Sequence, residues 1–255
     1  MVTPLSIDEL TEHDIAKAID HSLLRPELDD AFVEDGCRLA AAYDVASVCV
    51  RPADVRRAAA ILAGTDVAVG TTIGFPHGGH LTQVKVEEAR RALADGATEL
   101  DMVIQIGALK AGRDADVQAD IAAVVEVAHA AGAIVKVIFE NAYLTDDEKV
   151  RACRLSEAAG ADFVKTSTGF APSGATHDDL RLMRANTSPH IQVKAAGGVR
   201  TLDGLLEVMA LGVTRVGATQ TKAIIDDFRA RKAGVTGVAG VGGVGGAAPN
   251  PGEAD

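Results

Sequence analysis

Eight short apolar runs, each followed by a longer amphipathic segment, constrain the fold of this chain more than any other feature of its sequence. The runs that we predict to be strands are residues 18–23, 45–50, 66–72, 98–104, 133–139, 161–166, 190–195 and 213–217. The segments that we predict to be helices are residues 29–43, 53–63, 80–95, 113–131, 145–159, 176–186, 201–211 and 219–232. Strands that alternate with helices form a parallel sheet, and eight such units are the number that closes a barrel. We therefore predict an α/β chain that folds as a single (β/α)8 TIM barrel.

An open, doubly wound sheet is the alternative to a closed barrel. Such a sheet usually carries Gly-x-Gly-x-x-Gly after its first strand, and no such motif follows His21 here. A capping box formed by Ser6 and Glu9 predicts an extra helix at the N-terminus. From residue 233 the chain is nearly all Gly, Ala, Val and Pro, which is too little apolar bulk for a core. We predict one barrel domain over residues 1–232 and a disordered Gly/Ala-rich tail over residues 233–255.

Composition narrows the classes of partner. The net charge of −11 disfavours nucleic acid and anionic membranes as partners, although a local site can still bind an anionic substrate. No apolar run reaches transmembrane length, and the first residues lack the basic and apolar regions of a signal peptide. The three cysteines form no Cys-x-x-Cys pair and no metal-binding spacing, which fits a reducing compartment. We therefore expect a cytoplasmic protein.

Three of the nine lysines lie inside predicted strands: Lys136, Lys165 and Lys194. Lysine is almost never fully buried unless it is paired, and burial lowers its pKa and frees the amine as a nucleophile. Side chains alternate along a strand, so Asp101 points into the barrel mouth if its apolar neighbours pack on the helices. The same alternation gives Lys165 the side of Phe163 and Lys194 the side of Gln192. Lys136 has apolar neighbours on both sides, so its direction stays open.

Two lysines and one carboxylate in a small volume are the functional groups that imine chemistry requires. Two ammonium groups held close together cannot both stay charged at low cost, so the pKa of one of them falls. A neutral lysine can then attack a carbonyl and form a Schiff base, while Asp101 holds the other lysine charged and moves protons near it. A buried Lys–Asp pair that only fixes the core is the structural alternative, but such pairs are costly and seldom improve stability.

Glycine-containing loops after three strands suggest a phosphate site. In barrels, the loops after strands 7 and 8 commonly bind phosphate through backbone N–H groups. Each loop alone can also be read as a tight turn. The candidate substrate and phosphate contacts are Thr168, Gly169, Gly197, Gly198, Gly217 and Thr219.

Several other polar residues are weaker candidates. Thr166 and Lys136 are expected to support the site, and Cys49 is expected to face it as a small buried hydrophobe rather than a nucleophile. His77 and His80 lack a third metal ligand at a convincing spacing, so we assign them to loop structure and predict no metal site.

At these residues the chain resembles the deoxyribose-phosphate aldolases, a family of class I, Schiff-base-forming aldolases built on a (β/α)8 barrel. The matching stretches are Asp20-His-Ser-Leu-Leu24, Ser47-Val-Cys-Val-Arg-Pro52, Thr72-Ile-Gly-Phe-Pro76, Glu99-Leu-Asp-Met-Val103, Lys136-Val-Ile-Phe-Glu140, Gly160-Ala-Asp-Phe-Val-Lys-Thr-Ser-Thr-Gly169 and Val193-Lys-Ala-Ala-Gly-Gly-Val199. The resemblance implies that Lys165 forms the imine and that Asp101 and Lys194 transfer protons. It further implies reversible cleavage of 2-deoxy-D-ribose 5-phosphate to D-glyceraldehyde 3-phosphate and acetaldehyde, in deoxyribose phosphate catabolism, with no metal or organic cofactor.

The chain departs from the family pattern at three places. Many members have a serine-rich stretch after the last strand, where this chain has Gly217-Ala-Thr-Gln-Thr, and Thr219 can replace a hydroxyl contact. Many members have a lysine where this chain has Phe170, which removes a charge for phosphate. Some members place a tyrosine near the C-terminus over the site, and this tail has none.

Two other functions remain open from the sequence. One is a sugar-phosphate isomerase that uses Asp101 as a base without an imine, and the other is a non-catalytic barrel that binds a sugar phosphate. The two strand lysines argue against the first, and the intact set of Lys165, Lys194 and Asp101 argues against the second. We also expect a homodimer, because the end surfaces of barrels commonly dimerise.

Overall fold

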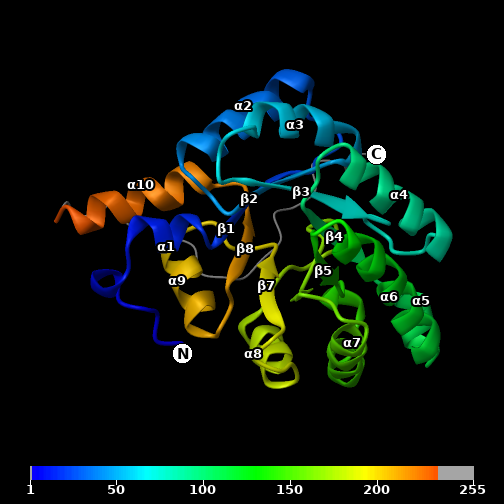
Figure 1. Cartoon of the computed structure of the whole chain (residues 1–255). Helices are drawn as coiled ribbons and strands as arrows, with labels where there is room; N and C mark the ends of the chain where they lie inside the picture. Colours follow the sequence, from blue (N-terminus) through cyan, green and yellow to red (C-terminus); the bar gives the residue numbers. More distant parts are fainter. Residues whose placement is uncertain (1, 235–255) are drawn as a thin grey trace, which may run out of the picture.

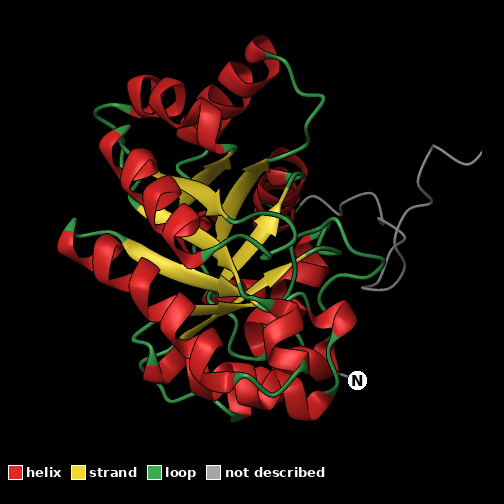
Figure 2. Ribbon diagram, turned by 90° about the vertical axis from the view of Figure 1, so that its right-hand side faces the viewer, coloured by secondary structure: helices red, strands yellow, loops and turns green. Residues whose placement is uncertain are grey.

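Eight parallel strands close into a barrel, as the sequence predicts (Figures 1 and 2). The computed structural model describes residues 2–234. Each strand pairs in parallel with the next one along the chain, and β8 closes the barrel against β1. The strands are β1 Ile19–Leu23, β2 Ser47–Val50, β3 Ala68–Ile73, β4 Glu99–Val103, β5 Ile134–Ile138, β6 Phe163–Lys165, β7 Gln192–Ala196 and β8 Arg215–Ala218.

Helices surround the barrel and connect successive strands (Figure 2). The eight that were predicted are α2 Asp30–Ala42, α3 Val55–Leu62, α4 Thr82–Ala94, α6 Asp114–Ala130, α7 Asp146–Ala158, α8 His177–Ala185, α9 Leu202–Ala210 and α10 Thr221–Lys232. The predicted ends of strands and helices differ from the observed ends by at most two residues. Short additional helical segments are the 3-10 turn η2 Pro52–Asp54, the α-helix α5 Ile106–Lys110 and the 3-10 turn η3 Asn141–Tyr143.

The N-terminal prediction is correct about an extra helical segment and wrong about its start. Ser6 caps only the single 3-10 turn η1 (Ile7–Glu9), through a hydrogen bond from the Asp8 N–H of 3.3 Å. The capping box belongs instead to Thr11 and Asp14, at the start of the short helix α1 (Glu12–Ala16). Of the predicted tail, all but residues 233 and 234 lie outside the described residues.

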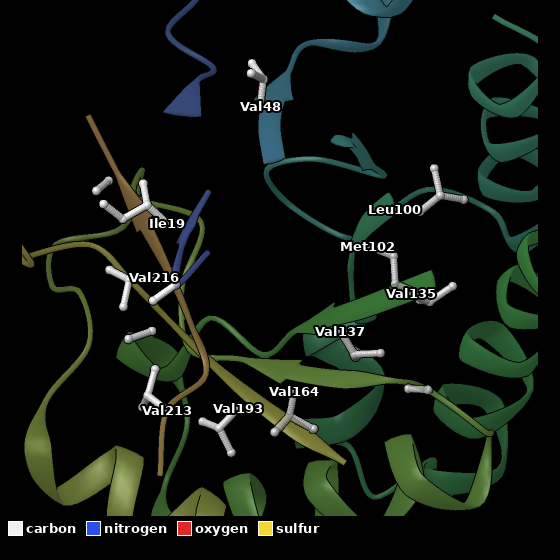
Figure 3. Packing of buried hydrophobic residues seen from close by; sticks show 14 of the residues in the cluster. Ile19, Val48, Leu100, Met102, Val135, Val137, Val164, Val193, Val213 and Val216 are labelled. Carbon is white, nitrogen blue, oxygen red and sulfur yellow. The ribbon is translucent and has the colours of Figure 1, made fainter. Parts of the chain in front are cut away.

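The outward and inward faces of the barrel strands differ in character. The outward faces are apolar and pack on the helices, and Figure 3 shows members of this cluster from β2, β4, β5, β6, β7 and β8. The inward faces of β1, β4, β5, β6, β7 and β8 carry charged side chains, and two of these, Asp101 and Lys136, are completely buried inside the barrel. Because side chains alternate along a strand, an apolar outer layer forces the residues between its members to point inward.

A buried ion pair outside the barrel holds the strand that carries Asp101. Lys85 of α4 and Asp120 of α6 are both fully buried, and the Lys85 Nζ lies 2.5 Å from a carboxylate oxygen of Asp120. The same ammonium donates to the carbonyl of Val103, the last residue of β4, over 2.8 Å. Thr82 and Gln105 also donate to the Asp120 carboxylate. This network therefore ties two helices to the carboxyl end of β4.

We expect Asp120→Ala to lower the free energy of unfolding by about 3–5 kcal/mol, because it leaves the buried Lys85 ammonium without its counter-charge. Chemical denaturation measures this loss. Asp116→Ala is the matched control, since Asp116 lies on the same helix in an exposed pair with Arg113 and its loss should cost under about 1 kcal/mol. Equal losses in the two variants would contradict the structural role of the pair.

Candidate active site

Asp101 brings the two predicted lysines together. The Nζ of Lys165, at the end of β6, and the Nζ of Lys194, in β7, each lie 2.7 Å from the same oxygen of Asp101 in β4. All three side chains are at most 4 % exposed. The structure thus confirms the inward direction that strand alternation predicted for each of them.

Lys136 also points into the barrel, which settles the direction that the sequence left open. Its Nζ lies 3.2 Å from the second oxygen of Asp101, 3.2 Å from Asp20 and 2.5 Å from Glu99. Asp20 in turn lies 2.5 Å from Lys194. Lys136 therefore contacts three carboxylates, Lys194 two and Lys165 one.

The number of carboxylate contacts explains how the three amines differ. Burial lowers the pKa of Lys165, and the Lys194 ammonium lowers it further, against the attraction of Asp101. Burial also disfavours the charged form of Lys194, but Asp101 and Asp20 together raise its pKa above the ordinary value. The pKa of Lys136 is raised in the same way. Lys165 is thus the amine of the three that most readily loses its proton.

Asp101 stays ionised despite complete burial. Burial alone would raise the pKa of its carboxyl, but Lys136, Lys165 and Lys194 hold that pKa well below its usual range. A carboxylate between an amine that readily loses its proton and an amine that stays charged is able to accept and return protons.

The sequence analysis missed Asp20, Glu99 and Arg215, which complete the charged interior. The Arg215 guanidinium in β8 donates to Asp20 over 2.9 Å and also to Glu99. The Ser47 hydroxyl donates to the same oxygen of Asp20 over 2.7 Å. The available signal was the one that identified the lysines, namely a charged residue inside a short apolar strand.

The predicted phosphate loops lie next to each other. The N–H of Ala175, in the loop after β6, donates to the carbonyls of Ala196 and Gly197 over 3.0 and 2.9 Å. Gly174 packs so closely that a Cβ there would lie 2.3 Å from the Gly197 carbonyl oxygen. Gly197 and Gly198 both have left-handed backbone conformations, with φ of 77° and 102°. The loops after β6 and β7 therefore form one surface at the mouth of the barrel.

The predicted threonine contacts have different roles. Thr166 joins β6 to β7, since its hydroxyl accepts from the Ala196 N–H over 3.1 Å. The hydroxyl of Thr168 donates to the buried Glu140, which also accepts from the Thr168 N–H over 3.2 Å. Glu140 adopts a left-handed conformation with φ of 58°, which is uncommon for a residue other than glycine. Thr166 and Thr168 thus use their hydroxyl groups to shape the loop.

The remaining predicted residues lie around this centre. Gly169 and Thr219 are exposed. Gly217 of β8 lies beside Lys194, because a Cβ added there would be 3.8 Å from the Lys194 Cε. Burial raises the pKa of Cys49 to about 11, which keeps its thiol protonated and agrees with the interpretation of a small buried hydrophobe.

Two features of the barrel mouth bear on phosphate binding. Phe170 is 47 % exposed and packs edge-on against Phe75 of the loop after β3, with 5.4 Å between the ring centres. Arg200, which the sequence analysis missed, is exposed and follows the Gly197-Gly198 turn. It has no ion-pair partner among residues 2–234.

His77 and His80 are exposed in the loop after β3. Over residues 2–234, no three His, Cys, Asp or Glu side chains are grouped as metal ligands. In the same range, every helix is too short or too polar to cross a membrane.

Comparison with known proteins places the chain among aldolases. A family model described as DeoC/LacD family aldolase matches residues 10–238. A deoxyribose-phosphate aldolase from Rhodopirellula baltica is 52 % identical over 217 residues, which cover 85 % of this chain and 90 % of the relative. One from Lysinibacillus sphaericus is 49 % identical, with 84 % and 96 % covered. A structure described as a tetrameric deoxyribose phosphate aldolase from Aeropyrum pernix is 29 % identical, with a TM-score of 0.82 over 88 % of this chain and 95 % of the other.

We expect Lys194→Leu to raise the pKa of Lys165 by about one unit, because it removes the ammonium that opposes a second positive charge. The fold should persist, since Lys136 still neutralises Asp20 and Asp101. The pH dependence of Lys165 amidination by methyl acetimidate, followed by peptide mass analysis, reports this pKa. Lys149→Leu is the control, because that lysine pairs with Asp179 outside the barrel. An unchanged midpoint in Lys194→Leu would show that Lys194 does not lower the Lys165 pKa.

Proposed function

The chain belongs to the DeoC/LacD family of aldolases, and we propose that it reversibly cleaves 2-deoxy-D-ribose 5-phosphate into D-glyceraldehyde 3-phosphate and acetaldehyde. The observation that supports this function most directly is the position of the Asp101 carboxylate. One of its two oxygens lies 2.7 Å from the Nζ of Lys165 and 2.7 Å from the Nζ of Lys194. This arrangement brings together, inside the barrel, an amine that readily loses its proton, an amine that stays charged and a carboxylate that can accept a proton from either. A class I aldolase needs these three groups to form and use an imine.

The first half of the reaction builds the electron sink. The neutral Lys165 amine adds to the C1 aldehyde of the open-chain sugar, and loss of water gives a protonated imine. Lys194 and Asp101 supply and remove the protons of these steps. Because acetaldehyde carries two carbons, the bond that breaks is C2–C3.

The second half of the reaction releases the two products. The C3 hydroxyl loses its proton, the C2–C3 electron pair moves toward the imine, and C3 becomes the aldehyde of glyceraldehyde 3-phosphate. The resulting enamine takes a proton at C2, and water then hydrolyses the imine to free acetaldehyde and the Lys165 amine. Asp101 is the proton carrier that we assign to these steps, directly or through a water molecule.

The phosphate end of the substrate is proposed to lie on the loops after β6, β7 and β8. Gly169, Gly197, Gly198 and Gly217 allow close approach of the backbone, Thr168 shapes the loop, and Thr219 offers an exposed hydroxyl. Phe170 brings no charge to this surface. We assign the missing positive charge to Arg200, which follows the Gly197-Gly198 turn and is exposed.

The isomerase and the non-catalytic barrel account for less of this site. An isomerase needs a base near the sugar carbons but has no use for an amine whose pKa is lowered by its surroundings. A binding barrel has no use for the buried charges, which are costly to keep. The curated relatives are deoxyribose-phosphate aldolases by name, which supports the aldolase as well.

We propose a cytoplasmic enzyme that works as a homodimer or a larger assembly. Its three cysteines are buried and unpaired, in keeping with a reducing compartment. The relative from Aeropyrum pernix is described as tetrameric, which supports an assembly of more than one subunit.

Borohydride trapping tests the proposed reaction. Incubation with acetaldehyde followed by reduction should add one ethyl group to Lys165, and Lys165→Ala should lose this adduct and reduce kcat by roughly 10⁴-fold or more. Lys17→Ala serves as the control, because that lysine pairs with Asp44 away from the barrel interior. No adduct in the wild type, or an unchanged adduct in Lys165→Ala, would rule out the proposed mechanism.

Arg200→Ala tests the phosphate assignment. Loss of one charge-assisted contact should lower kcat/KM for 2-deoxyribose 5-phosphate by about 10- to 100-fold, with little effect on unphosphorylated 2-deoxyribose. Arg181→Ala is the control, because that exposed side chain pairs only with its helical neighbour Asp178 among the described residues. Equal losses for both sugars in Arg200→Ala would show that Arg200 does not recognise phosphate.

A further inference from the structure

The inside of the barrel holds one more basic group than acidic groups. The basic side chains are those of Lys136, Lys165, Lys194 and Arg215, and the acidic ones are those of Asp20, Glu99 and Asp101. All seven lie at most 11 % exposed, so water screens their charges weakly. If all were ionised, the interior would carry one net positive charge. Release of one proton from the network makes it neutral.

Glu99 and Arg215 take part in this balance without contacting Lys165. Arg215 donates to Glu99 and to Asp20, and Glu99 lies 2.5 Å from the Lys136 Nζ. Lys136 then reaches Asp101, the one carboxylate in contact with Lys165. The two residues are thus joined to Lys165 through an unbroken series of ion pairs. Neither has a role in the proposed reaction steps.

We propose that Glu99 and Arg215 are positioning residues, which act as opposing charges to fix the net charge around Lys165 and so keep its amine ready to react. The inference rests on the proposed role of Lys165 as the nucleophile. Removing the Glu99 charge makes the interior more positive and drives the proton off Lys165 more easily. Removing the Arg215 charge makes the interior more negative and holds that proton in place.

The other groups near Lys165 do not replace this balance. The titratable groups that surround its amine most closely are Asp101, Lys194, Cys49 and Glu140. Cys49 keeps its proton, as its raised pKa indicates. Burial raises the pKa of Glu140, whose carboxyl is bound by Thr168 rather than by a lysine. Asp101 and Lys194 belong to the network itself, so its net charge depends on Glu99 and Arg215 as well.

Opposite shifts in two single variants test the proposal. We expect Glu99→Gln to move the midpoint of Lys165 amidination by methyl acetimidate down by about one pH unit, and Arg215→Met to move it up by a similar amount. The double variant should return the midpoint close to that of the wild type. Arg215→Lys keeps the charge and should keep the wild-type midpoint.

A merely structural role for the pair gives a different pattern. Loss of packing or of a hydrogen bond would lower stability in both single variants without shifting the midpoint in opposite directions. Midpoints that stay unchanged, or that move in the same direction, would overturn the proposal. Thermal unfolding of each variant shows whether its fold is intact. If a single variant does not fold, the double variant still tests the proposal, because it restores the charge balance and should keep the wild-type midpoint.

The readout separates this inference from the proposed function. Amidination reports the proton on Lys165 whether or not the chain acts on a sugar. Opposite shifts without any acetaldehyde adduct would support the charge balance and reject the aldolase. An acetaldehyde adduct at Lys165 without opposite shifts would support the aldolase and reject the role of Glu99 and Arg215.

Discussion

The carboxylate of Asp101, shared by three lysines, is the interaction on which the rest of this structure depends. One of its oxygens binds Lys165 and Lys194, and the other lies 3.2 Å from Lys136. These lysines come from three strands, so β4, β5, β6 and β7 must keep their register for the site to exist. Because a buried charge without a partner is costly, the network also penalises any displacement of one strand against another.

Because the interior of the barrel is charged, the outward strand faces and the helices must supply most of the apolar packing. Barrel interiors are usually filled by branched apolar side chains, which stabilise the fold themselves. Here the apolar contacts lie mainly between the outward strand faces and the helices, as Figure 3 shows for Leu100, Val135 and Val193. The Lys85–Asp120 pair adds a polar tie from those helices to the end of β4. The fold therefore draws its stability from outside the barrel and leaves the inside free for chemistry.

The sequence predicted the elements and the three central residues for clear physical reasons. Strand and helix periods differ, so the eight units could be read directly, and alternation within β4, β6 and β7 gave the inward direction of Asp101, Lys165 and Lys194. The Ser6 prediction failed because Thr11 offers an equivalent pattern five residues later: Thr11 and Asp14 close the capping box that starts α1, whereas Ser6 caps a single 3-10 turn.

Other parts of the site depend on contacts between segments that are far apart in the chain, and no local pattern in the sequence predicts these contacts. Asp20 meets Lys194 and Arg215 only because β1 closes against β8. The ring of the neighbouring His21 points the other way, and its Nδ1 lies 2.8 Å from the Thr221 hydroxyl. The hydroxyl of Thr168 is used by Glu140, a contact between two loops that no local pattern reveals.

The central claim is that Lys165 loses its proton more readily than the two lysines that share its carboxylate. Titration of the wild-type protein with ¹³C-labelled lysine side chains, followed by NMR, measures this most directly. One resonance, absent in Lys165→Ala, should titrate with a pKa below the ordinary lysine range. The amines of Lys136 and Lys194 should keep their protons at pH values above that range. A Lys165 resonance that titrates at or above the ordinary lysine value would contradict the account.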